Sequence, residues 1–415
     1  MRWILLVGLV SCQHKVVAWG EIDRDVVVDL VAEVARIRET WPTRPVRVKL
    51  QRARDLRAAV ERDLADDVAS GSIARRQRAW GKIGLVPWDF DLAAWERRTY
   101  GDDPAGYYLT SERKLYVVDR PAFRSDLLEV WGAIVGRDPA YGEALAHEVA
   151  HALVDQKHDL DSLLKGELTS DQELARRALA EGDATKVAFE WDGGGSFSRH
   201  LDRLEDRIGA LSDEGTPEWL SARISLPYVA GGRIVERLHR RGGWSAVDRA
   251  YGSPPQSSEQ LLHPERYPSD RPTTVTVPAE PIGEGSDRRI LHDSVGELGM
   301  RSVLRRHLPR NRADAAAAGW DGDAVGVWET GDGMMLVWKS AWDSERDAEE
   351  WADAYAELVE ESYGNPRRTA APPGAVRWTS REGAIGVEWD GTEVLVYEGV
   401  PEPRRAELVS RLSGE

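Results

Sequence analysis

Three polar residues, His147, Glu148 and His151, interrupt an otherwise apolar stretch between Ala144 and Val154. In a helix the two histidines lie at i and i+4 on one face, with Glu148 at the edge of that face. A helix that is apolar on its other faces is usually buried, and burying these groups costs several kcal/mol without a compensating partner. His-Glu-x-x-His places two imidazoles around a zinc ion and a carboxylate beside its water. The stretch therefore predicts a zinc site.

The competing interpretation is a core helix with two structural histidines. Its weakness is the apolar surroundings, because a core helix has no reason to bury three ionisable groups so close together without a charge that meets them. The zinc interpretation is therefore favoured over it.

A catalytic zinc site needs a third protein ligand and an open coordination position. A metzincin would place a histidine ten residues after His147, where this chain has Lys157, and His158 comes one residue too late. Glu181 is the predicted third ligand. It shares a helical face with four small residues, so its helix can approach the first one closely. The alternative for Glu181 is a solvated helix position. The small residues on its face are Ala178, Ala184, Thr185 and Ala188.

Two further carboxylates are candidates for supporting roles. Asp183 is either a competing ligand or a residue that orients a ligand imidazole, and Asp155, one turn beyond His151, is a second candidate for the orienting role. Gly182 costs roughly 1 kcal/mol in a helix relative to Ala, which indicates a position of close packing.

His147-Glu-Val-Ala-His151 followed by Glu181-Gly-x-Ala184 resembles the gluzincin zinc peptidases, whose third ligand is commonly a Glu in a Glu-Gly-x-Ala context. The pattern is also similar to exported bacterial proteins of that type, many of them lipoproteins. The resemblance covers roughly residues 20–345 and is strongest over 141–191. Its other matching pieces are Gly106 to Tyr108, Leu226 to Tyr228, Gly242 to Trp244 and Ser258 to Pro264.

The resemblance implies that Glu148 removes a proton from a zinc-activated water as the water attacks a peptide carbonyl. The oxyanion then needs a second donor, for which Tyr228 and His263 are the candidates. The alternative is structural, with Tyr228 packed beside a turn and His263 capping the bend at Pro264.

The expected fold is α+β, with a zincin-like core in which two zinc helices pack on a small mixed sheet. Residues 106–119 read as a hairpin, and its edge strand could pair with an extended substrate. Helices are expected at 21–39 and 53–69, and a strand at 44–50. The second zinc helix is expected to begin with a capping box made by Ser170 and Glu173.

The predicted domains are a core over residues 13–195, a helical subdomain over 196–266 that completes the cleft, a Pro-rich linker over 267–288 and an α+β domain over 289–415. No partner of this last domain can be identified from the sequence. Trp320-Asp-Gly322 and Trp389-Asp-Gly391 each precede an alternating apolar strand, which suggests a duplicated hairpin.

The first twelve residues resemble a lipoprotein signal, in which an apolar run leads to Leu9, Val10, Ser11 and Cys12. Because Cys12 is the only cysteine, disulfides within the chain and thiolate metal clusters are excluded. An acylated Cys12 would place the protein in the bacterial cell envelope, facing away from the cytoplasm. The alternative is a buried first strand of a cytoplasmic protein.

The net charge of −16 argues against nucleic acid as a partner, because phosphate binding needs clustered Lys and Arg. The function expected is zinc-dependent hydrolysis of peptides or proteins. Two alternatives stay open: a non-catalytic, zinc-stabilised envelope lipoprotein that acts as a binding module, and a hydrolase of non-peptide amides. The presence of Glu148 argues against the first, because a structural site has no use for a base beside the metal.

Overall fold

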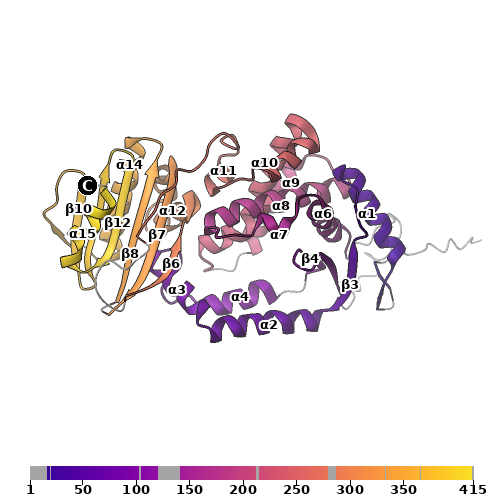
Figure 1. Cartoon of the computed structure of the whole chain (residues 1–415), viewed down its shortest axis with the longest axis horizontal. Coiled ribbons are helices and arrows are strands. Elements are labelled where there is room, and N and C mark those ends of the chain that lie inside the picture. The colour runs from indigo at the N-terminus through magenta and orange to yellow at the C-terminus, as the bar shows by residue number, and fades with distance from the viewer. Residues whose placement is uncertain are drawn as a thin grey trace, which may run out of the picture.

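The computed structural model is an α+β structure with three parts: a small mixed sheet, a helical middle and a C-terminal seven-stranded antiparallel sheet with helices (Figure 1). It describes residues 16–413 except 19, 102–103, 120–140, 212–214, 279–286, 332 and 365. Cys12 and its apolar leader lie outside these residues. Among the helices that the structure describes, none is long and apolar enough to cross a membrane.

The small sheet has the strand order β3-β5-β4, so β4 is its outer strand. β3 (Arg47–Arg52) runs parallel to β5 (Lys114–Asp119), and β4 (Gly106–Leu109) pairs antiparallel with β5, as the predicted hairpin requires. A two-stranded ribbon, β1 (Val17–Ala18) and β2 (Glu21–Ile22), leads into helix α1 (Arg24–Arg38). Asp23 caps α1 by accepting from the backbone N–H groups of its first turn.

Helices α2 (Ala53–Ala69), α3 (Ser72–Ile83) and α4 (Leu92–Gly101) connect the small sheet to the C-terminal sheet (Figure 1). α2 follows β3 directly, as expected from the sequence, and α3 packs against β6, β7 and β8. The buried Lys82 of α3 binds the carboxylate of Glu398 at 3.1 Å and the hydroxyl of Tyr363 at 3.3 Å. This ion pair fixes the C-terminal domain to the N-terminal half.

The helical middle consists of α6 (Gly142–His158), α7 (Leu160–Leu163), α8 (Ser170–Trp191), α9 (Phe197–Leu211), α10 (Glu218–Tyr251, kinked at Gly242 and Gly243) and α11 (Ser258–Leu262). α8 packs against both α6 and α10. A Cβ on Gly182 would lie 2.2 Å from the backbone carbon of Gly231. The close approach predicted from Gly182 is therefore real, but its partner is α10 rather than α6, the helix with the His-Glu-x-x-His sequence.

The capping box of α8 lies one residue earlier than predicted. Thr169 is the N-cap and exchanges hydrogen bonds with Gln172. The hydroxyl of Ser170, the predicted cap, instead donates to Asp293 of the C-terminal domain. This long-range partner shifts the cap.

The C-terminal sheet has the order β6-β7-β8-β12-β11-β10-β9, and each neighbouring pair is antiparallel. Helix α14 (Glu345–Ser362) covers one face, where Trp338 meets Trp351 and Tyr355. On the other face lie Leu408 of α15 (Glu402–Ser413) and Val277. The strands are β6 (Arg288–Asp293), β7 (Trp320–Thr330), β8 (Gly333–Trp342), β9 (Arg367–Thr369), β10 (Ala375–Ser380), β11 (Gly383–Asp390) and β12 (Glu393–Val400); α12 (Gly296–Leu304) and α13 (Arg310–Ala317) precede β7.

Two sequence interpretations change here. Part of the predicted Pro-rich linker packs on the sheet, because Val275 and Val277 contact its second face and the backbone N–H of Thr273 donates to Asp321. The two Trp-Asp-Gly sequences occupy different places: Trp320 opens β7, whereas Trp389 lies near the end of β11. They do not mark a duplicated hairpin.

Buried carboxylates join the start of α8 to the C-terminal domain. The Asp171 carboxylate accepts from the backbone N–H of Ser258 at 3.0 Å, and Asp293 accepts from the backbone N–H of Ser170 at 2.6 Å. Gly296, at φ +67°, lies so close to Asp171 that a Cβ there would be 2.0 Å from a carboxylate oxygen. This junction therefore depends on close packing around acidic groups.

The junction predicts that the free energy of unfolding falls as pH rises from about 4 to about 8. Burial raises the pKa of Asp171 to about 8, because it outweighs the Ser258 hydrogen bonds, which lower this pKa, and the nearby Asp323 charge adds a smaller increase. The folded state then holds a proton that the unfolded state has released, so stability present below pH 4 is lost as pH rises through 8. Asp171→Asn should reduce this slope by up to about 1.4 kcal/mol per pH unit.

Urea unfolding at pH 5, 6, 7 and 8 measures this slope. Asp63→Asn, at an exposed position of α2, is the matched control and should leave it unchanged. An Asp171→Asn slope equal to that of the wild type would contradict the assignment of this proton to Asp171.

Candidate metal centre

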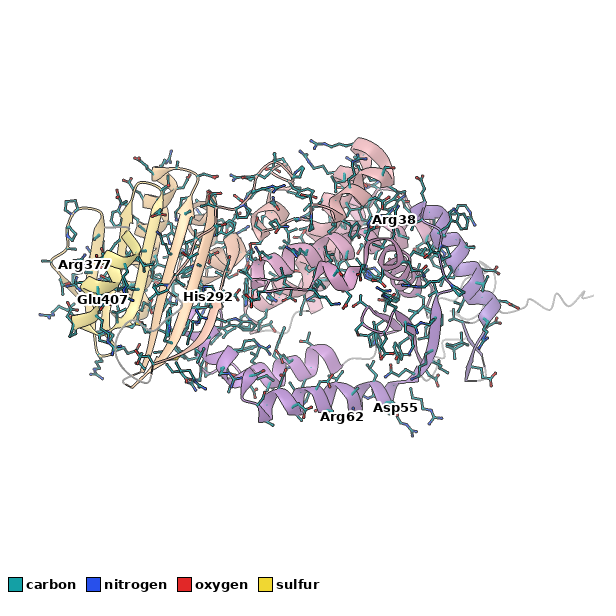
Figure 2. The ribbon with its side chains drawn as sticks, in the orientation of Figure 1. Arg38, Asp55, Arg62, His292, Arg377 and Glu407 are labelled. Atoms are coloured by element: carbon teal, nitrogen blue, oxygen red, sulfur yellow. The ribbon has the colours of Figure 1, made fainter. Side chains whose placement is uncertain are left out.

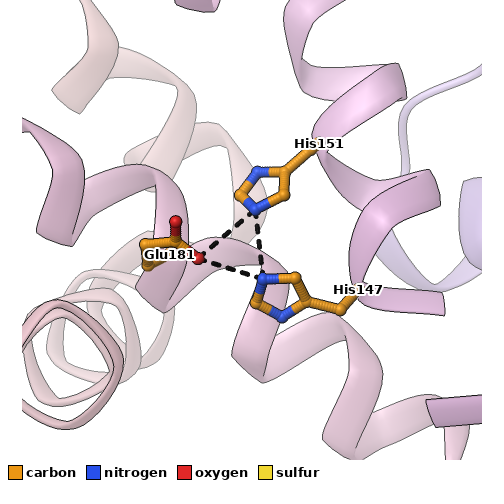
Figure 3. Close-up of side chains that lie close together, drawn as sticks. All are labelled: His147, His151 and Glu181. Atoms are coloured by element: carbon orange, nitrogen blue, oxygen red, sulfur yellow. Dashed lines mark hydrogen bonds and ion pairs between the residues drawn. The ribbon is translucent and has the colours of Figure 1, made fainter. Parts of the chain in front are cut away.

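Helices α6 and α8 bring His147, His151 and Glu181 together (Figure 3). Nε2 of His147 lies 3.0 Å from Oε2 of Glu181, and Nε2 of His151 lies 3.4 Å from the same oxygen. The two Nε2 atoms are 3.1 Å apart. The side chains are only 13–18% exposed, so the group faces the space between the two helices and is partly shielded from water.

These distances fit a shared metal ion. Around a tetrahedral ion with ligands at about 2.0–2.1 Å, neighbouring ligand atoms lie about 3.3 Å apart. The three observed separations lie close to that value. Two imidazoles and one carboxylate are also a donor set used by catalytic metal sites that keep one position open. The group can therefore hold a metal ion.

The pKa shifts of these residues also favour a bound metal ion. Burial by itself raises the pKa of Glu181, but His151 and His147 reverse this and hold it well below its usual range. Burial lowers the pKa of His151, but the Glu181 carboxylate overrides this and raises it to about 9. The site thus retains a positive charge next to Glu181. A bound metal ion would supply that charge and displace the proton, since ligand imidazoles must be neutral.

Glu148 is adjacent to this group but is not part of it. Its Oε2 accepts a 2.7 Å hydrogen bond from the backbone N–H of Tyr108, in strand β4. Burial raises the pKa of Glu148, more than the neighbouring imidazoles lower it. A partly buried carboxylate that is held by one backbone donor and lies outside the His-His-Glu group is suited to accept a proton.

The two oxyanion candidates are separated by the fold. Tyr228 is in α10, and its ring centroid lies 6.0 Å from that of His147, so it belongs to the site's surroundings and does not pack beside a turn. His263 follows α11, and its Nε2 lies 3.1 Å from Glu297. α11 contacts α8 near Asp171, which is ten residues, or about 15 Å, from Glu181 along the helix. His263 therefore lies away from the three ligand groups.

Asp183 is neither a ligand nor a partner of a ligand imidazole in the structure. It is fully buried and makes a bidentate ion pair with Arg38 of α1, at 2.7 and 2.9 Å (Arg38 is labelled in Figure 2). It also accepts from the hydroxyl of Tyr251. Asp248 extends this network by binding both Arg38 and His158. His158, whose spacing excludes it as a metzincin-type third ligand, thus binds Asp248 in this network.

Asp155 also differs from its predicted role. Its Oδ2 accepts from the hydroxyl of Tyr108 at 2.7 Å, and its Oδ1 accepts from the backbone N–H of Leu160 at 2.9 Å. The first contact joins α6 to strand β4 and the second joins it to the start of α7, so neither involves an imidazole. Nothing in the spacing of Asp155, Tyr108 or Arg38 along the chain indicates these pairs.

The fold and the site define an α+β protein with a His-His-Glu group that can hold a metal ion. Comparison with known families adds one finding: a model described as a domain of unknown function (DUF8575) matches residues 285–410, the C-terminal sheet and its helices. No curated protein and no solved structure matches the chain.

Proposed function

We propose that this protein is a zinc-dependent peptide hydrolase of the gluzincin type. The observation that supports this most is the position of Glu148, a base next to a His-His-Glu group and outside it. A bound zinc ion would supply a Lewis acid that activates water and polarises a carbonyl. A purely structural site would need the three ligands but not a second carboxylate beside them.

Glu148 would accept the proton of the attacking water and later deliver it to the leaving amine. The hydrogen bond from the Tyr108 N–H at 2.7 Å holds one oxygen of Glu148, which leaves the other for the water. Its low exposure to solvent favours proton transfer within the site over exchange with bulk water.

An extended peptide is the substrate class that the surroundings favour. β4 is the outer strand of the small sheet within the described residues, and the Tyr108 N–H points to α6 instead of pairing with β5. A peptide added along this edge would pass beside Glu148 and the zinc ligands. Tyr228, beside His147, is our candidate for the second oxyanion donor.

Removing zinc should abolish peptide hydrolysis, and restoring it should return the activity. The measurement is cleavage of a diverse peptide library by zinc-loaded protein, by protein treated with a chelator such as 1,10-phenanthroline, and by treated protein supplied with Zn²⁺. The zinc-loaded sample should cleave and the chelated one should not. A zinc-loaded protein that cleaves no peptide would favour the non-catalytic binding module or a hydrolase of other amides.

The lipid anchor stays a prediction from the sequence, because Cys12 lies outside the described residues. We propose that acylated Cys12 holds the protein at the outer side of a bacterial membrane, where peptide or protein substrates would reach the site. Labelling with a palmitate analogue and fractionation of wild type and Cys12→Ala would test this. Finding the wild type unlabelled and soluble in the cytoplasm would overturn it.

A further inference from the structure

Tyr108 contacts helix α6 at two points. Its backbone N–H donates to Glu148, and its hydroxyl donates to Asp155 at 2.7 Å. Glu148 and Asp155 are seven residues apart, two turns on one face of the helix. Tyr108 of the edge strand is thereby held to α6, the helix that carries the His-Glu-x-x-His motif, at two points about 10 Å apart along its axis.

Asp155 is placed to hold this contact firmly. It is 2% exposed, and its second oxygen is fixed by the backbone N–H of Leu160, where α6 ends and α7 begins. Burial and the Asp155 carboxylate both raise the pKa of Tyr108, so its hydroxyl stays protonated and remains a donor. A buried charge-assisted hydrogen bond of this kind is stronger than one between neutral groups.

The turn of the β4–β5 hairpin is tied to the same end of α6. Arg113, in the turn at φ +52°, lies 3.9 Å from Asp155 and 3.4 Å from Asp159, which follows α6. Asp155 thus faces a hydroxyl of the strand and a guanidinium of the turn. The hairpin is therefore fixed to α6 at its strand and at its turn.

We propose that Asp155 is a positioning residue that, through the Tyr108 hydroxyl, sets the place of strand β4 against α6 and so directs the Tyr108 N–H at Glu148. The inference rests on the proposed function and adds to it: the substrate-binding edge and the base are held in register by one buried carboxylate. Asp155 acts through Tyr108 and touches neither zinc nor substrate.

Two variants test this. Tyr108→Phe removes the hydroxyl and keeps the ring, whereas Asp155→Asn keeps the side-chain shape and removes the charge. Tyr116→Phe is the matched control, because Tyr116 lies in the same hairpin but its hydroxyl donates to Glu112. Hydrogen–deuterium exchange of the peptide containing residues 106–109 reports the strand directly and needs no enzymatic activity.

Both test variants should speed exchange in this peptide about tenfold or more, with zinc content and the urea midpoint close to those of the wild type. On a peptide substrate, kcat/KM should fall about tenfold or more. Tyr116→Phe should match the wild type in all of these. A general structural role for Asp155 would instead speed exchange throughout α6 and α8 and lower the urea midpoint.

Unchanged exchange over residues 106–109 in both variants would overturn the proposal, whatever their activity. Faster exchange with kcat/KM unchanged would also overturn it, since the strand would then not need its position for catalysis. If the wild type cleaves no peptide, the proposed function fails, while the exchange arm still decides whether Asp155 holds the strand.

Discussion

Glu148→Gln should bind zinc and fold as the wild type does, and its peptide hydrolysis should fall by about 10³-fold or more. Gln is nearly isosteric, so the packing of α6 is preserved, and its amide oxygen can still accept from the Tyr108 N–H. It cannot take a proton from the attacking water. The measurement is kcat/KM on one cleaved peptide, with zinc content determined on the same preparation.

The matched control for this substitution is Glu143→Gln, five residues earlier on α6 and outside the metal group, which should hydrolyse like the wild type. Full activity in Glu148→Gln would show that another residue is the base. Loss of zinc together with activity would instead assign Glu148 a role in holding the metal.

Glu181→Ala should weaken zinc binding by more than the roughly 10–100-fold typical of changes outside the ligand shell. It removes one of three ligands and leaves His147 and His151, whose Nε2 atoms lie 3.0 and 3.4 Å from its carboxylate. Competition with a chromophoric chelator measures the affinity.

Asp183→Asn is the matched control, two residues further along α8. It should keep zinc but lower the free energy of unfolding by about 3–5 kcal/mol, because it leaves Arg38 without its buried bidentate partner. Asp248 still contacts Arg38, which favours the lower end of this range. If Asp183→Asn lost zinc while Glu181→Ala kept it, the third ligand would be assigned to the wrong carboxylate.

The members of the candidate metal group could be predicted because their signals are local. His147 and His151 are one helical turn apart, and the Glu181 motif combines a carboxylate with close-packing residues. The hairpin at 106–119 and helix α2 were predictable for the same reason, since periodicity and turn residues act over a few positions. The structure confirms both the hairpin and the helix.

The roles of Asp155 and Asp183 could not be predicted because their partners lie far away in sequence. Arg38 and Asp183 are separated by 145 residues, and Tyr108 and Asp155 by 47. Both acidic residues stand near a ligand in the sequence, which favoured an orienting role. In the folded chain each meets an earlier element first, α1 for Asp183 and β4 for Asp155.

The position of His263 could also not be predicted from the sequence, because its partner lies in another domain. Its place in the gluzincin-like pattern offered a catalytic role, but α11 packs at the start of α8, where Glu297 of the C-terminal domain binds the imidazole.

Helix α3 could have been predicted from a local signal in the sequence: Ile73, Trp80 and Ile83 are spaced as the buried face of a helix.

The most direct test of the metal centre is the metal content of the wild-type protein, measured by native mass spectrometry and followed by X-ray absorption at the zinc edge. One zinc ion per chain should be found, with nitrogen and oxygen ligands at about 2.0–2.2 Å and no sulfur ligand. A protein that takes up no zinc at neutral pH, or that binds it with His147 and His151 both replaced by Ala, would contradict the account.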